Sequence, residues 1–344
     1  MTARVRTLTA TVALVLAALT LPTLSTGAAS RLPSRLADRE FWQLSTDASE
    51  QDGYFRSDNL TSNETGFLHV VPELVARTKP GEVYLGVGPE QNYSYIAATH
   101  PAMAIIFDIR RGNLLLQLMY KAIFELTRDR AGFVSMLFSR PRPEGLTADT
   151  PVGELFNAFG NATRDEALYE RNLTAITDRL VKFHGFPLTA PELNGMRGIY
   201  RAFFDRGYAI RYSPTYADLM TATDLRGAHR SYLASESAFA VVRELENANL
   251  VVPVVGDFGG PKAIRTIAAY LKAHDAVVGA FYLSNVEQYL GQDGKMTAFC
   301  RSVAALPLDQ TSTFIRSTSG RGNGFGFGFV SSLGPMAAET RDCR

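Results

Sequence analysis

Metal-ligating and reactive side chains are scarce in this sequence. Only two of its 344 residues are cysteine and five are histidine, and no two histidines lie three or four positions apart, the spacing that places two ligands on one helix face. We therefore expect no metal site. The chain also lacks a Gly-x-Ser-x-Gly elbow, so it offers no recognisable hydrolase nucleophile.

Neither sign of charge is in excess. The chain carries 35 lysine and arginine residues against 34 aspartate and glutamate residues, and the basic residues are dispersed along it. A nucleic-acid partner would require a basic patch or stripe. We therefore expect a small-molecule ligand and no nucleic acid.

Long hydrophobic runs are also lacking. The apolar run at 12–21 is too short for a comfortable bilayer span, follows two arginines and precedes small residues, which is the layout of a secretory signal peptide. We predict a signal peptide at 1–29, with an uncleaved anchor as the alternative. Residues 30–344 would then form one exported domain without a stable membrane span. In an oxidising compartment Cys300 and Cys343 could form a disulfide, or they could remain thiols, because spacing does not show proximity.

A glycine turn is the strongest local pattern. A short apolar run enters the turn at 83–92, and about twenty residues later a second apolar run ends at Asp108. This is the order of parts in a nucleotide-binding βαβ unit. Gly86 and Gly88 would let a ligand approach the backbone, and Asp108 would accept hydrogen bonds from a ribose diol. A purely structural turn is the alternative.

Two later apolar runs are predicted to end at the same edge of a parallel sheet. The run at 250–255 contains Pro253, which suggests an edge or early-strand position, and leads to Asp257 and Phe258. These two residues could face an adenine, or Asp257 could cap the next helix. The run at 277–283 leads to polar residues that we expect on the substrate side, although an asparagine there is also an ordinary helix cap.

A polar segment at 57–65 precedes the glycine turn. Its side chains are typical helix caps, so Ser62 or Asn63 could cap a helix through 68–74. Alternatively, the segment folds over the glycine turn and contributes Asn63 and Glu64 to a ligand pocket.

The remaining segments predict accessory structure. The arginines at 110–111 could bind an anionic substrate, or could form salt bridges with Asp108 or Glu90. From about 128 to 246, helical periodicity predicts an inserted helical subdomain that covers the ligand edge of the sheet. The glycine-rich end, about 318–344, could be a terminal strand or a flexible tail.

The motifs resemble those of a known class of proteins. Leu-Gly-Val-Gly-Pro at 85–89, followed by Asp108, resembles the first two motifs of class I S-adenosylmethionine-dependent methyltransferases. More closely, 84–92, 108–114 and 281–290 resemble an uncharacterised bacterial family regarded as having a methyltransferase-like fold, over about 55–317. The resemblance implies an α/β fold with a mostly parallel Rossmann-like sheet of the class I methyltransferase type, and S-adenosylmethionine as the cofactor. The candidate cofactor-binding residues are Gly86, Gly88, Glu90, Gln91, Asn92, Asp108, Asp257 and Phe258, and the candidate substrate-binding residues are Tyr282, Asn285, Glu287, Asn63 and Glu64.

Two functions are consistent with these residues. The first is a methyltransferase-like protein of unidentified acceptor, since methyl transfer needs alignment and desolvation more than a catalytic triad. The second is an exported, non-enzymatic small-molecule-binding protein that reuses the fold. Tyr84 stands where methyltransferases usually carry an acidic residue, and Glu90 replaces a glycine, which favours the second.

Overall fold

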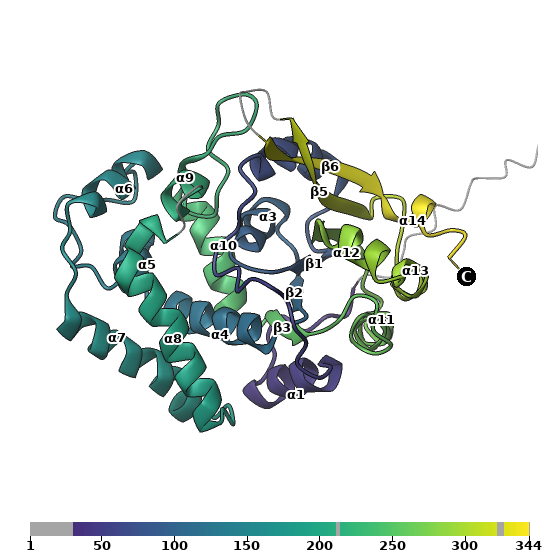
Figure 1. Ribbon diagram of the computed structural model, residues 1–344, viewed down its shortest axis with the longest axis horizontal. Coiled ribbons are helices and arrows are strands. Elements are labelled where there is room, and N and C mark those ends of the chain that lie inside the picture. The colour runs from purple at the N-terminus through teal and green to yellow at the C-terminus, as the bar shows by residue number, and fades with distance from the viewer. Residues whose placement is uncertain (1–29, 211–213, 322–326, 344) are drawn as a thin grey trace, which may run out of the picture.

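The computed structural model describes residues 30–210, 214–321 and 327–343, so the predicted signal peptide at 1–29 lies outside the described residues. The described chain is an α/β protein built on one six-stranded sheet in the order β3-β2-β1-β4-β5-β6 (Figure 1). Neighbouring strands from β3 to β5 run parallel, and β6 runs antiparallel to β5. The α/β class and the mostly parallel sheet are therefore confirmed. The strands are β1 Val83–Val87, β2 Met103–Asp108, β3 Val251–Val255, β4 Val278–Ser284, β5 Thr313–Arg321 and β6 Phe327–Pro335.

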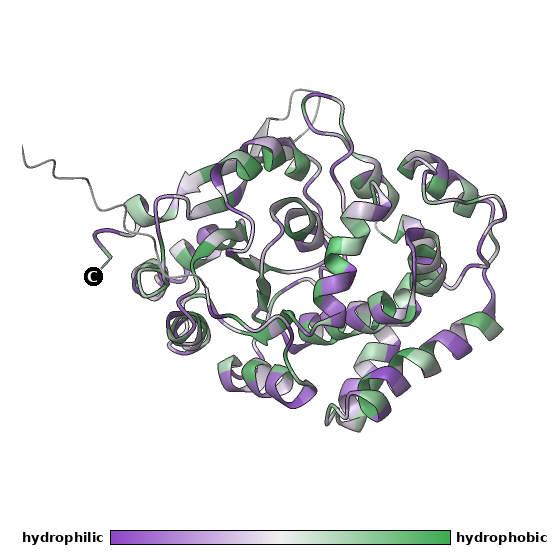
Figure 2. Ribbon diagram, turned by 180° about the vertical axis from the view of Figure 1, so that it is seen from behind, coloured by the Kyte–Doolittle hydropathy of each residue, from purple (hydrophilic) through white to green (hydrophobic). Residues whose placement is uncertain are grey.

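The strands β1 to β4 lie within the hydrophobic core, to which the surrounding helices also contribute. All residues of β2 and β3 are buried, as expected for parallel strands covered on both faces. Figure 2 shows hydrophobic residues in these central strands and hydrophilic residues on the outer helices. Pro253 lies in β3, which pairs only with β2, so the predicted edge position is confirmed.

Helices cover both sides of the sheet. In Figure 1, α3 (Gln91–Thr99), α4 (Arg111–Leu126) and α10 (Glu236–Asn247) lie on one side. On the other side lie α11 (Ala263–Ala273), α12 (Val286–Gln292) and α13 (Met296–Val303). The N-terminal helix α1 (Asp38–Ala48) packs against β3 and α11. A 3-10 turn η1 (Phe67–Val70) and helix α2 (Val71–Arg77) precede β1. No helix among the described residues is long and apolar enough to cross a membrane.

The segment between α4 and β3 is helical, as the sequence predicted. It contains α5 (Arg130–Phe138), α6 (Val152–Gly160), α7 (Glu166–Asp178), the π-helix η2 (Arg179–Phe183), α8 (Ala190–Arg206), the 3-10 turn η3 (Gly207–Ala209), α9 (Tyr216–Thr221) and then α10. This insertion packs on the body of the molecule through contacts of α7 and α8 with α4. Most of α4 is buried, because it lies between the sheet and these helices.

The C-terminal segment forms a strand. β6 pairs with β5 as a hairpin, which agrees with the terminal-strand alternative, and the connecting residues 322–326 lie outside the described part. A short helix, α14 (Met336–Glu339), follows. Cys300 of α13 and Cys343 form a disulfide, so the chain end is tied to the helix layer.

Candidate functional site

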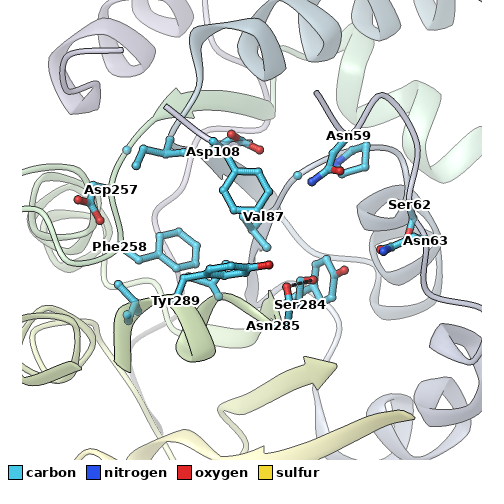
Figure 3. A pocket seen from close by; sticks show the side chains of 18 of the residues that line it. Asn59, Ser62, Asn63, Val87, Asp108, Asp257, Phe258, Ser284, Asn285 and Tyr289 are labelled. Carbon is cyan, nitrogen blue, oxygen red and sulfur yellow. Dashed lines mark hydrogen bonds between the residues drawn. The ribbon is translucent and has the colours of Figure 1, made fainter. Parts of the chain in front are cut away.

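The carboxyl ends of β1, β2, β3 and β4 surround a cavity of about 210 Å³ (Figure 3). Each strand end contributes to its lining: Gly88 follows β1, Asp108 ends β2, Phe258 follows β3 and Ser284 ends β4. Parallel strands present their carboxyl ends at one edge, so residues distant in the sequence meet there. The structure thus brings most of the candidate site residues into one cavity.

The two glycines of the turn have different surroundings. Gly88 lines the cavity with φ +79°, a backbone conformation that favours glycine, and a Cβ placed there would meet no atom within 4 Å. Gly86 lies within β1 and is not a lining residue. A Cβ on Gly86 would lie 2.8 Å from Cε1 of Tyr84 and would collide with Oδ1 of Asn92. Gly86 is therefore required by internal packing, whereas Gly88 borders the ligand space.

The residues that follow the turn lie behind the cavity. Glu90, Gln91 and Asn92 are almost completely buried, and none is a lining residue. Asn92 accepts a hydrogen bond from the Tyr84 hydroxyl at 2.9 Å and donates to the Pro89 carbonyl at 2.7 Å. Glu90 accepts from the backbone N–H of Ser62 at 3.1 Å. Asn92 therefore holds the turn in shape, Glu90 and Gln91 bind the segment that precedes the turn, and none of the three lines the cavity.

Asp108 lies at the cavity wall in an ion pair with Arg110. Its Oδ1 accepts from the backbone N–H of Arg110 at 2.9 Å and from Nε at 3.2 Å. Burial raises the pKa of Asp108, although the Arg110 guanidinium acts in the opposite direction. The salt-bridge alternative therefore holds for Arg110, whereas Arg111 pairs with Glu192 of α8 at 2.6 Å. Three donated bonds leave the Asp108 carboxylate room to accept one more.

Asp257 and Phe258 form one end of the cavity, beyond β3 (Figure 3). Asp257 accepts from Nζ of Lys295 at 2.5 Å and from the backbone N–H of Gly259 at 2.9 Å. This hydrogen bond to Asp257 raises the pKa of Lys295. Phe258 is buried and stacks on Phe299, with ring centroids 5.9 Å apart.

The polar segment before the turn crosses the carboxyl edge of the sheet. Asn63 and Glu64 line the cavity, as the pocket alternative predicted. The capping alternative is wrong, because η1 and α2 begin without a side-chain cap. Arg110 holds this crossing segment (52–65) through a 2.5 Å hydrogen bond to the Asp58 carbonyl.

Glu64 forms a buried network at the opposite end of the cavity from Phe258. Its Oε1 accepts from Ser284 Oγ at 2.5 Å, and its Oε2 accepts from Gln91 Nε2 at 2.9 Å. The side chain is only 1% exposed, and burial raises its pKa. Tyr282 also lines this end, and burial raises its pKa well above the usual range, so the phenol is neutral.

The two candidate residues that follow β4 have different surroundings. Asn285 lines the cavity beside Ser284, and its side chain makes no capping hydrogen bond to α12 (Figure 3). Glu287 is not a lining residue, because it pairs with Arg316 of β5, with Oε2 2.5 Å from Nε. Asn285 therefore belongs to the cavity, and Glu287 fastens α12 to the sheet.

Several lining residues were missed by the sequence analysis. Tyr54 and Phe55 come from the crossing segment, and Tyr289 comes from α12. Phe55 and Tyr289 meet edge to face, with centroids 5.2 Å apart. Ser284 was missed as a site residue although it ends β4, and its φ of +51°, uncommon for serine, has no signal in the sequence.

The helical insertion contributes no residue to the lining in the described part of the chain. The expectation that it covers the ligand edge is wrong, because its helices pack against α4, beside the sheet. Among the described residues, no group of three or more histidine, cysteine, aspartate or glutamate side chains is placed to hold a metal ion.

The cavity can orient a small polar ligand. Carboxylates lie at both ends, and the aromatic rings of Phe55, Phe258 and Tyr289 supply apolar walls between them. Such a lining suits a ligand that combines a ring with hydrogen-bonding groups.

Comparison with known proteins gives a family and no activity. No curated protein matches the chain. A family model described as a domain of unknown function (DUF7790) matches residues 60–151 and 206–334. These ranges make up more than half of the chain and include Glu64, Gly88, Asp108 and Ser284, whereas 152–205, in the helical insertion, lies outside them. The chain belongs to the DUF7790 family.

Proposed function

We propose that the sheet is Rossmann-like, of the class I methyltransferase type, and that its cavity binds S-adenosylmethionine. The strand order supports this, because nucleotide-binding sheets of order 3-2-1-4-5 bind their ligand where the order reverses, outside β1 and β4. One observation carries the proposal: Gly88, Asp108, Phe258 and Ser284, from four adjacent strand ends, line a single cavity at that place.

The lining residues support distinct roles. Asp108 retains capacity to accept a hydrogen bond from a ribose hydroxyl, and Gly88 leaves space for the ligand beside the backbone. Phe258 offers a ring face or edge to an adenine. The bound cofactor would supply a methyl group on a sulfonium. The residues at the Glu64 end would then orient the acceptor.

A second candidate is an exported binding protein without enzymatic activity. Asp108 and Asp257 each have a cationic partner already, Arg110 and Lys295, which reduces their capacity for ligand hydrogen bonds. The Cys300–Cys343 disulfide supports export, since disulfides persist in oxidising compartments. Outside the cytoplasm the same cavity would recognise another small molecule.

The test is calorimetric titration with S-adenosylmethionine and S-adenosylhomocysteine. We expect both to bind the purified chain, and Asp108→Asn to weaken binding about tenfold or more, because the substitution removes the charge that accepts from the ribose. Asn keeps the shape of the side chain, so the fold should persist, as circular dichroism would check. Glu73→Gln, on the exposed Glu73–Arg77 pair, is the matched control and should bind normally.

The outcomes separate the two candidates. Binding that depends on Asp108 supports the methyltransferase-like function and justifies a search for acceptors. Absence of heat with both compounds, in a sample with the circular dichroism of a folded α/β protein, would overturn it and favour the binding protein.

A further inference from the structure

With Glu64 ionised, the hydrogen bonds around it have a fixed direction. The Ser62 hydroxyl donates to Oε1 of Gln91, which places the amide hydrogens of Gln91 toward Glu64 Oε2 (2.9 Å) and the Tyr95 hydroxyl (3.2 Å). Ser284 has one hydroxyl hydrogen. Its bond to Glu64 is 2.5 Å long, and its distance to Oδ1 of Asn285 is 3.4 Å, so the shorter, charge-assisted bond takes that hydrogen.

This direction decides what the cavity offers to a ligand. Ser284 lines the cavity and donates its hydroxyl hydrogen to Glu64. The lone pairs of its Oγ are therefore available to accept a hydrogen bond from a ligand. Glu64 lines the same end and accepts from Ser284 and Gln91, and the hydroxyl groups of Tyr282 and Ser317 also interact with its carboxylate. These oxygens are acceptors and call for a ligand group that donates.

The distribution of charged side chains also favours a ligand that donates hydrogen bonds. Glu64 forms no salt bridge within the described part of the chain, although its side chain is 1% exposed. The lysine of the lining, Lys295, pairs with Asp257 at 2.5 Å. Figure 3 shows Asp257 on the opposite side of the cavity from Ser284 and Asn285. Burial raises the pKa of Glu64, and a ligand cation at this end of the cavity would stabilise the ionised carboxylate.

We propose that the end of the cavity formed by Glu64, Tyr282, Ser284 and Asn285 binds a protonated amine of the substrate. Glu64 supplies the negative charge, Ser284 supplies an acceptor at the cavity, and the Tyr282 ring adds an aromatic wall. The inference rests on the proposed use of this cavity as the ligand site. It names the substrate class as amines, and it excludes carboxylates and phosphates from this end.

The experiment compares three compounds of one shape and different charge: phenethylamine, phenethyl alcohol and hydrocinnamate. All carry a ring that Phe55 and Tyr289 can contact. Their affinities for the purified chain are measured at neutral pH by ligand-observed NMR titration. The variants are Glu64→Gln and Ser284→Gly, in which glycine accepts the φ of +51° without strain. Glu73→Gln is the control, because it removes the same charge from an exposed glutamate that does not line the cavity.

We expect the wild-type chain to bind the amine about tenfold or more tightly than the alcohol, and hydrocinnamate more weakly than either, because a charge-assisted hydrogen bond is worth about that ratio. In Glu64→Gln, the new amide would donate to Ser284, whose hydroxyl would turn toward the cavity. The ratio of amine to hydrocinnamate affinity should therefore fall about tenfold or more. Ser284→Gly should weaken amine binding several-fold, and Glu73→Gln should change it less than about twofold.

Equal affinity for amine and alcohol, lack of amine binding at millimolar concentration, or an unchanged ratio in a folded Glu64→Gln sample would each overturn the inference. None of these results depends on S-adenosylmethionine. A chain that binds the amine and no cofactor would contradict the methyltransferase-like function alone.

Discussion

At the scale of single residues, the two glycines of the turn can be compared by the same substitution to alanine. Gly88→Ala places a methyl group in open space, so its cost is the strain of φ +79°, about 1 kcal/mol. Gly86→Ala forces the new methyl group against Tyr84 and Asn92, whose mutual hydrogen bond is buried, and should cost about 3 kcal/mol. Urea unfolding of both variants measures the difference. A larger loss of unfolding free energy in Gly88→Ala than in Gly86→Ala would contradict the packing role of Gly86.

The same residues show what the sequence could predict about the site. The βαβ pattern located Gly88 and Asp108, because strand ends follow from apolar runs and glycine turns. It also assigned Gln91 and Asn92 to the ligand. Every residue of α3 from Gln91 to Ala97 is buried, so its sequence gives no amphipathic signal of which side faces the cavity. Tyr54 and Phe55 were missed because they lie in a segment without regular structure, placed by long-range contacts.

At the scale of elements, the strands could be predicted from the sequence, whereas the position of the helical insertion and the disulfide could not. β3 and β4 are continuous apolar runs, which periodicity detects, and Pro253 correctly suggested an edge. The insertion was correctly predicted as helical, but its position beside α4 depends on which helix faces pack together, and a single sequence does not give that. For the same reason, the cysteine spacing left the disulfide open.

The disulfide joins two elements that otherwise lie at the surface. Cys300 belongs to α13, and Cys343 follows α14, 43 positions further along the chain. Closing a loop of this length restricts the unfolded chain, so replacing both cysteines with serine should lower the free energy of unfolding by about 2–4 kcal/mol. Chemical denaturation of the double variant, compared with the oxidised wild-type chain, measures this. Equal stability of the two proteins would show that the covalent link does not restrict the unfolded chain.

At the scale of the whole molecule, a buried ionic cluster connects the N-terminal helix, the insertion and the body. His184, just after η2, lies 2.7 Å from Asp38 of α1 through Nδ1 and 2.7 Å from Glu125 of α4 through Nε2. Lys121 of α4 pairs with Glu125 at 2.8 Å and donates to the main-chain carbonyl of Glu246 in α10 at 2.5 Å. The cluster therefore joins α1, the residue after η2, α4 and α10. A change of pH that alters its charges should affect the packing of all four.

Glu246 determines the sign of this effect. Burial raises its pKa from 4.5 to about 8, since Lys121 offsets only part of the desolvation and Glu125 opposes ionisation. Below pH 4.5 the carboxyl is protonated in the folded and unfolded chains alike, and its contribution to stability is fully present. Between pH 4.5 and about 8 the unfolded chain releases the proton while the native state keeps it, so stability falls as pH rises.

Glu246→Gln should abolish this loss, because an amide does not titrate. The unfolding free energy of the variant, measured relative to the wild-type chain by urea denaturation, should therefore rise between pH 5 and pH 8, by up to about 1 kcal/mol per pH unit. Glu73→Gln, at an exposed glutamate, should follow the wild-type profile at every pH. Parallel profiles for Glu246→Gln and the wild-type chain would mean that Lys121 keeps Glu246 ionised in the native state throughout this range. The attraction between the two side chains would then exceed the cost of burying the carboxylate.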